Sequence, residues 1–199
     1  MTIFLSSAPC GAAVNALAEP GTPQPSGRLV LIVGPSSAGK DTLLRFAQIR
    51  LQHRDDILFP RRVITRPPDA SEIHEPITSA AFEARRSAGD FALDWIAHGL
   101  SYGIPAMISD AIADGRTVVV NVSRNVVATA RTRFPTFVIA IEAGHSIRAL
   151  RLAHRARELS DDQTERLARG TAPVEPDAVI VNDGPIAAVA QHLIRLIAG

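Results

Sequence analysis

The sequence predicts an α/β fold in which helices cover both faces of a parallel central sheet, so that the domain has three layers. Two observations lead to this prediction. Four short runs are mostly apolar and rich in β-branched residues, as strands buried on both faces usually are; they are 29–33, 117–121, 137–141 and 178–181. Helical segments separate these runs, and strands that alternate with helices are typical of parallel sheets.

The first expected helix, residues 41–53, offers Leu43, Leu44, Phe46 and Ala47 for a buried face. The last expected helix is amphipathic and closes the chain. The remaining expected helices lie between the predicted strands, at 105–113, 124–133, 145–154 and 161–169, and the last one covers 185–197.

The segment 61–103 breaks this alternation. An extended stretch at 61–66 is followed by a short helix at 79–88 and by two short strands at 91–97 and 100–102. We expect this segment to form a small insert on the central sheet, with short strands of its own.

Length, charge and composition limit the classes of function. A chain of 199 residues can form one domain with a full core, which we place at 28–199. A net charge of +1 and 5% aromatic residues argue against nucleic-acid binding, and no apolar run is long enough to cross a membrane. The single cysteine, Cys10, excludes an internal disulfide and fits a reducing compartment, so we expect a cytoplasmic protein.

Residues 1–27 end in a Pro/Gly-rich linker and are expected to be a disordered extension. A signal peptide is the alternative, but the segment has no basic n-region and its apolar stretch is interrupted.

A glycine-rich loop joins the first predicted strand to the first helix. It consists of Gly34, Pro35, Ser36, Ser37, Ala38, Gly39 and Lys40. The backbone N–H groups of such a P-loop and the helix N-terminus bind phosphate, and its lysine reaches the β- and γ-phosphates. Lys40 is the only lysine, while the other 20 basic residues are arginines. Genome bias explains why arginine is frequent but not why the one lysine lies in this loop. We therefore expect the loop to bind phosphates, with ATP as a cofactor.

The residue after Lys40 is Asp41, where Ser or Thr is usual, and Thr42 follows. A carboxylate can hold Mg²⁺ directly or through water. The alternative is an acid that complements the helix dipole. We therefore expect Mg²⁺ with ATP, and Asp41 and Thr42 as the candidate metal-side residues.

The order of motifs resembles the guanylate kinase superfamily of P-loop phosphotransferases. The loop is followed by Ile64-Thr65-Arg66, then by Trp95 with Tyr102-Gly103, then by an arginine-rich stretch and Val181-Asn182-Asp183. Gly39-Lys40-Asp41, the stretch 62–66 and Asn121 with Arg124 look most like ribose 1,5-bisphosphate phosphokinases of the PhnN type. The resemblance implies a P-loop kinase fold with an acceptor-binding insert at about 61–103 and an arginine-rich lid at about 145–165.

The implied activity is the ATP-dependent phosphorylation of ribose 1,5-bisphosphate to 5-phospho-α-D-ribose 1-diphosphate (PRPP), in phosphonate breakdown and the supply of PRPP and NAD. The partner would be this small sugar phosphate. The residues implied to contact the acceptor are Arg62, Arg66, Tyr102 and Asn121. Guanylate kinases have a guanine-contacting serine at the position of Arg62 and acids near Asn121, and extra arginine suits an acceptor with two phosphates.

Guanylate kinase activity is the alternative, because Asp94 lies where guanylate kinases have a guanine-reading glutamate. A contact with a ribose hydroxyl is another role for Asp94. The minor alternative is a non-catalytic guanylate-kinase-like binding module; such modules can lose the P-loop lysine and the lid arginines, and both are present here.

The lid candidates are Arg148, Arg151, Arg155 and Arg157. The first three share one helix face by their i+3 and i+4 spacing. Cations at this place can close over the triphosphate and stabilise charge on the transferred group, and we expect Arg151 and Arg155 to reach ATP. A solvated helix is the alternative. By the same resemblance, Asn182 belongs to the loop on the adenine side.

Overall fold

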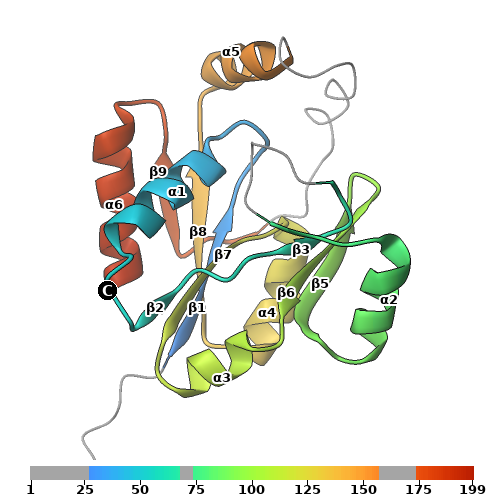
Figure 1. Cartoon of the computed structure of the whole chain (residues 1–199). Helices are drawn as coiled ribbons and strands as arrows, with labels where there is room; N and C mark the ends of the chain where they lie inside the picture. Colours follow the sequence, from blue (N-terminus) through green and yellow to red (C-terminus); the bar gives the residue numbers. More distant parts are fainter. Residues whose placement is uncertain (1–26, 68–73, 157–173) are drawn as a thin grey trace, which may run out of the picture.

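The central sheet has five parallel strands in the order β2-β7-β1-β8-β9 (Figure 1). The computed structural model of the chain describes residues 27–67, 74–156 and 174–199, and of helix α5 beyond Arg151 it describes the backbone alone. The strands are β1 (Arg28–Val33), β2 (Ile57–Leu58), β7 (Thr117–Asn121), β8 (Thr136–Glu142) and β9 (Ala178–Val181). The predicted parallel sheet is confirmed.

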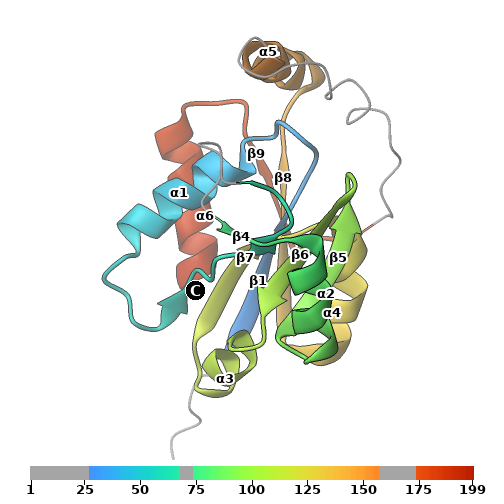
Figure 2. The ribbon, with the colours of Figure 1, turned by 45° about the vertical axis from the view of Figure 1, so that its right-hand side comes forward.

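Each face of the sheet is covered by its own helices because alternate side chains of β1 point to opposite faces. Val30 and Ile32 pack with α1 (Lys40–Arg50) and α6 (Ile186–Ala198). Leu29 and Leu31 pack with α3 (Ile108–Ala113), η1 (Arg124–Val126) and α4 (Val127–Arg133). Figure 2 shows α1 and α6 on one side of the sheet and α3 and α4 on the other. The three layers are therefore as predicted.

The segment between β2 and α3 forms a second, four-stranded sheet in the order β4-β3-β6-β5. Its strands are β3 (Val63–Ile64), β4 (Glu75–Pro76), β5 (Phe91–Ala97) and β6 (Leu100–Pro105). Helix α2 (Ser79–Ser87) packs on this sheet through Phe82, whose ring stacks on Phe91 with 4.7 Å between the centroids. The insert thus has a small core of its own. The β5–β6 hairpin is held beside the central sheet by Ala92, Leu93 and Ile104, which pack into the core under that sheet.

Helix α5 (His145–Ala156) follows β8 and lies beyond the carboxyl ends of the central strands (Figure 1). The phosphate loop leaves β1 at the same end, so α5 is placed next to it. No helix among the described residues is long and apolar enough to span a membrane.

The structure differs from the sequence predictions in several elements. Phe46 is 39% exposed, since α1 buries only the stripe formed by Leu43 and Ala47. Pro105 ends β6 and does not begin the next helix, which starts at Ile108. The two-residue strands β2 and β4 were not predicted. Residues 1–26 and the helix expected at 161–169 lie outside the described residues.

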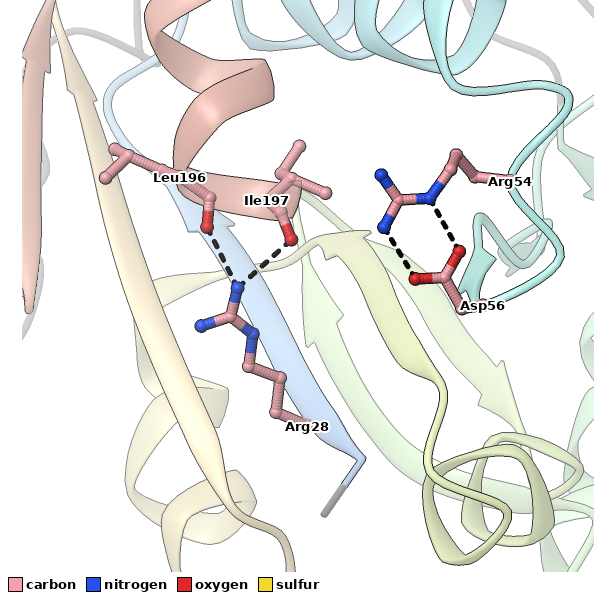
Figure 3. A network of polar contacts seen from close by, with 5 residues as sticks. All are labelled: Arg28, Arg54, Asp56, Leu196 and Ile197. Atoms are coloured by element: carbon pink, nitrogen blue, oxygen red, sulfur yellow. Dashed lines mark hydrogen bonds and ion pairs between the residues drawn. The ribbon is translucent and has the colours of Figure 1, made fainter. Parts of the chain in front are cut away.

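Hydrogen bonds join the start of β1 to the end of α6 (Figure 3). Arg28 Nη2 donates to the carbonyl oxygens of Leu196 and Ile197 at 3.1 and 3.0 Å. A cation at this place also complements the negative end of the helix dipole.

Figure 3 also shows an ion pair on the loop before β2, in which Arg54 donates two hydrogen bonds of 2.7 Å to Asp56. These bonds lower the pKa of the Asp56 carboxyl below its ordinary value.

Candidate active site

The phosphate loop can exist in this form only because it begins with Gly34. Gly34 has φ +149°, and a Cβ atom there would lie 2.1 Å from the carbonyl oxygen of Ile141 in β8. At the other end of the loop, Gly39 has φ +87° and is the N-cap of α1. Glycine has no side chain to cap the helix, so the first N–H groups of α1 can point toward an anion.

The Lys40 ammonium lies inside the loop. Its Nζ donates to the carbonyl oxygens of Gly34 and Pro35, each at 2.9 Å. These two bonds fold the side chain back along the loop, where a bound triphosphate would be cradled. The predicted position of Lys40 at a phosphate site thus agrees with the geometry, and its catalytic role stays a prediction.

A chain of hydrogen bonds links the start of α1 to the insert. Asn121, at the carboxyl end of β7, donates from Nδ2 to Asp41 Oδ1 at 2.7 Å. The main-chain oxygen of the same asparagine accepts from Arg62 Nη1 at 2.9 Å. Three of the predicted site residues, far apart in the sequence, are therefore brought together beside the phosphate loop.

Arg62 also lies over the ring of Tyr102, with 5.8 Å between the guanidinium carbon and the ring centroid. Tyr102 in turn stacks on Trp95 with 5.2 Å between centroids and an angle of 5° between the planes. This cation–aromatic stack holds the Arg62 guanidinium in place. Trp95 belonged to the motif that carries the family resemblance but not to the predicted site. Its position on the strand next to Asp94 was the feature of the sequence that could have indicated its place in the site.

The structure does not bring Asp94 into this stack. Asp94 precedes Trp95 on β5, and successive side chains of a strand point to opposite faces. Asp94 is exposed and lies on the face opposite to Trp95 and Tyr102. A role for Asp94 in reading an acceptor next to Arg62 therefore finds no support in this arrangement.

Arg66 lies two residues after β3, which ends at Ile64. The strand does not extend from Arg62 to Arg66, so the two arginines are not neighbours on one strand face. Arg66 is half-buried, and its carbonyl oxygen lies 3.1 Å from His74 Nε2. His74 is buried and holds the main chain at Arg66 through this contact.

Two of the arginines predicted to belong to a lid, both on α5, contact the phosphate loop. Arg151 donates from Nη1 to the carbonyl oxygen of Ala38 at 3.3 Å and from Nη2 to that of Asn182 at 3.0 Å. Arg148 Nε lies 3.4 Å from the carbonyl oxygen of Ser36. Arg148 was a lid candidate but was not among the arginines expected to reach ATP, although its spacing from Arg151 placed it on the same helix face. The Arg155 side chain and Arg157 lie outside the described residues.

Asn182 is 1% exposed and packs against the phosphate loop. Its Nδ2 donates to the carbonyl oxygen of Ala38 at 2.8 Å. Two buried atoms here, Ser37 Oγ and Asn182 Oδ1, have no hydrogen-bond partner within the described part of the chain. Buried polar atoms without a partner are costly, so a polar ligand at this loop would stabilise the arrangement.

Asp41 and Thr42 are both exposed on the first turn of α1. Mg²⁺ usually takes one or two protein oxygens and completes its shell with water and substrate phosphates. A carboxylate and a hydroxyl directly after the P-loop lysine fit this kind of binding. Among the described residues there is no group of three His, Cys, Asp or Glu side chains that could hold a metal ion.

Comparison with known proteins places the chain in a family. No protein-family model matches the chain. The ribose 1,5-bisphosphate phosphokinase PhnN of Acidiphilium cryptum is 60% identical over 158 residues, which cover 79% of this chain and 85% of that protein. The protein of the same name from Bradyrhizobium diazoefficiens is 45% identical over 174 residues, covering 86% and 88%. The chain belongs to the ribose 1,5-bisphosphate phosphokinase family.

The fold of this family member is that of the guanylate kinases. The guanylate kinase from Anaplasma phagocytophilum superposes with a TM-score of 0.59 over 88% of this chain and 86% of that one. Only 16% of the aligned residues are identical, so this likeness concerns the fold alone. The family and the fold class predicted from the sequence are both confirmed.

Proposed function

We propose that this protein transfers the γ-phosphoryl group of ATP to the 1-phosphate of ribose 1,5-bisphosphate and thereby forms PRPP and ADP. The observation that carries the proposal is the arrangement of Arg62, which is hydrogen-bonded to Asn121 and stacked on Tyr102 beside the phosphate loop. A guanidinium at this place suits an anionic phosphate group, whereas the N1–H and N2–H donors of a guanine need an acceptor, which arginine cannot supply. Family membership supports the same activity.

The donor side is the phosphate loop. Its backbone N–H groups and the N-terminus of α1 would bind the β-phosphate, and Lys40 would turn from its loop carbonyls to the β- and γ-phosphates. Arg148 and Arg151 already contact this loop from α5 and would stabilise negative charge on the group in transfer. Asn182 would lie on the adenine side, next to Ala38.

The acceptor side is the insert, with Arg62, Arg66 and Tyr102. The nucleophile is an oxygen of the 1-phosphate, which is already an anion at neutral pH. It forms a bond to the γ-phosphorus while the bond from that phosphorus to the β–γ bridging oxygen breaks, and ADP leaves. No general base is needed for such an acceptor, so the main tasks of the protein are to align two anions and offset their charge.

Mg²⁺, held on the protein side by Asp41 and Thr42, would neutralise charge on the β- and γ-phosphate oxygens. The residues of the chain would orient the ion through these two oxygens at the start of α1. The arginines and Lys40 supply the remaining positive charge around the transferred group.

Phosphorus NMR tests the proposal directly. The purified protein is incubated with ATP and Mg²⁺, with ribose 1,5-bisphosphate in one sample and GMP in another. We expect diphosphate signals of PRPP and ADP to grow only with the sugar bisphosphate. Formation of GDP in the second sample would favour guanylate kinase activity, and no turnover in either sample would refute the assigned reaction.

A further inference from the structure

Asn121 connects the donor side and the acceptor side through two different groups. Its side-chain amide donates to Asp41 Oδ1 at 2.7 Å, and its main-chain oxygen accepts from Arg62 Nη1 at 2.9 Å. The residue is buried, with 9% of its surface exposed. Asn121 was expected from the sequence to bind the acceptor, whereas these two hydrogen bonds join it to other side chains of the site.

The bond to Asp41 has a physical consequence. Asp41 is exposed on the first turn of α1, so without a partner its carboxylate could adopt several rotamers. A hydrogen bond from a buried neighbour selects one of them. Because the buried donor is an uncharged amide, it orients the carboxylate without neutralising it, as an arginine would, and without repelling it, as a second carboxylate would.

The bond from Arg62 fixes the other side of Asn121. The guanidinium is held by the stack on Tyr102 and by the Asn121 carbonyl oxygen at once. The main chain at the end of β7 is therefore held from the insert, and the Asn121 amide has a defined direction toward α1. A side-chain substitution at 121 removes the bond to Asp41 and leaves the main-chain acceptor of Arg62 in place.

We propose that Asn121 is a positioning residue, which holds the Asp41 carboxylate in the orientation required by the Mg²⁺ ion of the bound nucleotide. The inference rests on the proposed function, because it takes Mg²⁺-ATP as the donor. Groups that orient a metal-binding carboxylate typically contribute a factor of about 10 to 100 in metal affinity.

Calorimetry with a non-hydrolysable ATP analogue tests this without any acceptor. Affinity is measured with and without Mg²⁺ for the wild type, for Asn121→Ala and for the matched control Asn125→Ala, an exposed asparagine four residues further on. We expect Asn121→Ala to weaken binding in the presence of Mg²⁺ about tenfold or more and to leave metal-free binding unchanged. Asn125→Ala should match the wild type in both conditions.

A double-mutant cycle with Asp41→Ala shows whether the effect passes through the carboxylate. We expect Asn121→Ala to have no further effect on Mg²⁺-dependent binding once Asp41 is alanine. The inference is overturned if the full effect persists in that background, if metal-free binding weakens equally, or if Asn121→Ala and Asn125→Ala behave alike.

Thermal unfolding of each variant controls for a loss of fold. If Asn121→Ala does not fold, Asn121→Leu retains the side-chain volume but cannot donate, and the same loss of Mg²⁺-dependent affinity is expected. These binding measurements contain no acceptor, so they test the role of Asn121 separately from the proposed reaction. The role of Asn121 can be refuted while PRPP is formed, and it can be supported even if the NMR assay identifies a different acceptor.

Discussion

Replacing Arg62 by serine tests the acceptor site at its best-defined side chain. Serine is also the residue that guanylate kinases place there. The substitution removes the hydrogen bond to the Asn121 carbonyl oxygen, the stack on Tyr102 and the proposed contact with an acceptor phosphate. The first two fix the guanidinium in place, and the third acts on the substrate.

The size of the effect follows from the third contact. A hydrogen bond to a charged group is worth about 1.5–3 kcal/mol. Since about 1.36 kcal/mol corresponds to a factor of ten, the KM for ribose 1,5-bisphosphate should rise roughly 10- to 150-fold. The KM for ATP should change by less than about threefold, because the contacts of Arg62 with Asn121 and Tyr102 place it on the acceptor side of the site. Loss of the internal contacts should lower the free energy of unfolding by about 1 kcal/mol.

The assay follows ADP release while one substrate is varied and the other is saturating. Arg61→Ser is the matched control, since Arg61 is the exposed neighbour of Arg62 and carries the same charge. Arg62→Lys keeps the charge but not the planar guanidinium, so it should recover only part of the acceptor affinity. Equal increases in both KM values, or an equal effect of Arg61→Ser, would refute the role of Arg62.

Three further outcomes are expected. Lys40→Ala should lower kcat/KM by a factor of about 100 or more at an unchanged melting temperature, and normal turnover of the folded variant would contradict the site. Arg28→Ala should lower the free energy of unfolding in urea by about 1–3 kcal/mol, because it removes two hydrogen bonds at the end of α6, and Arg28→Lys should lose less. The lowered pKa of Asp56 means that its stabilising pair with Arg54 is complete at neutral pH and is lost as the pH falls through that pKa. Wild type and Asp56→Asn should therefore differ slightly in stability at pH 7 and converge in acid; a constant difference would contradict this.

The central sheet could be predicted because its strands are buried on both faces. The run 29–33 carries no polar residue, whereas a strand or helix with one face in water would carry polar residues on that face. By contrast, β2 contributes only Ile57 and Leu58, and two residues are too few to show a period. The order of the strands also has no signal in the sequence, since it depends on which crossover packs against which face.

The phosphate loop could likewise be predicted, because consecutive residues form it. The acceptor site could be predicted only as a set of residues. That Asn121 contacts both Asp41 and Arg62 depends on how the insert sits on β7, which is a tertiary relation. Asp94 and Trp95 are neighbours in the sequence, yet the pleat of β5 separates them to opposite faces.

The isolation of Lys40 has a practical consequence for chemical labelling. Apart from any terminal amino group, the chain offers a single amine, and that amine is half-buried against the carbonyl oxygens of Gly34 and Pro35. Reagents that couple proteins to sensor surfaces or dyes through lysine would therefore react at the phosphate loop itself. The same selectivity makes Lys40 a site for affinity labels. Bound nucleotides should block the attachment of such a label, and no more than one label per chain can attach to a side-chain amine.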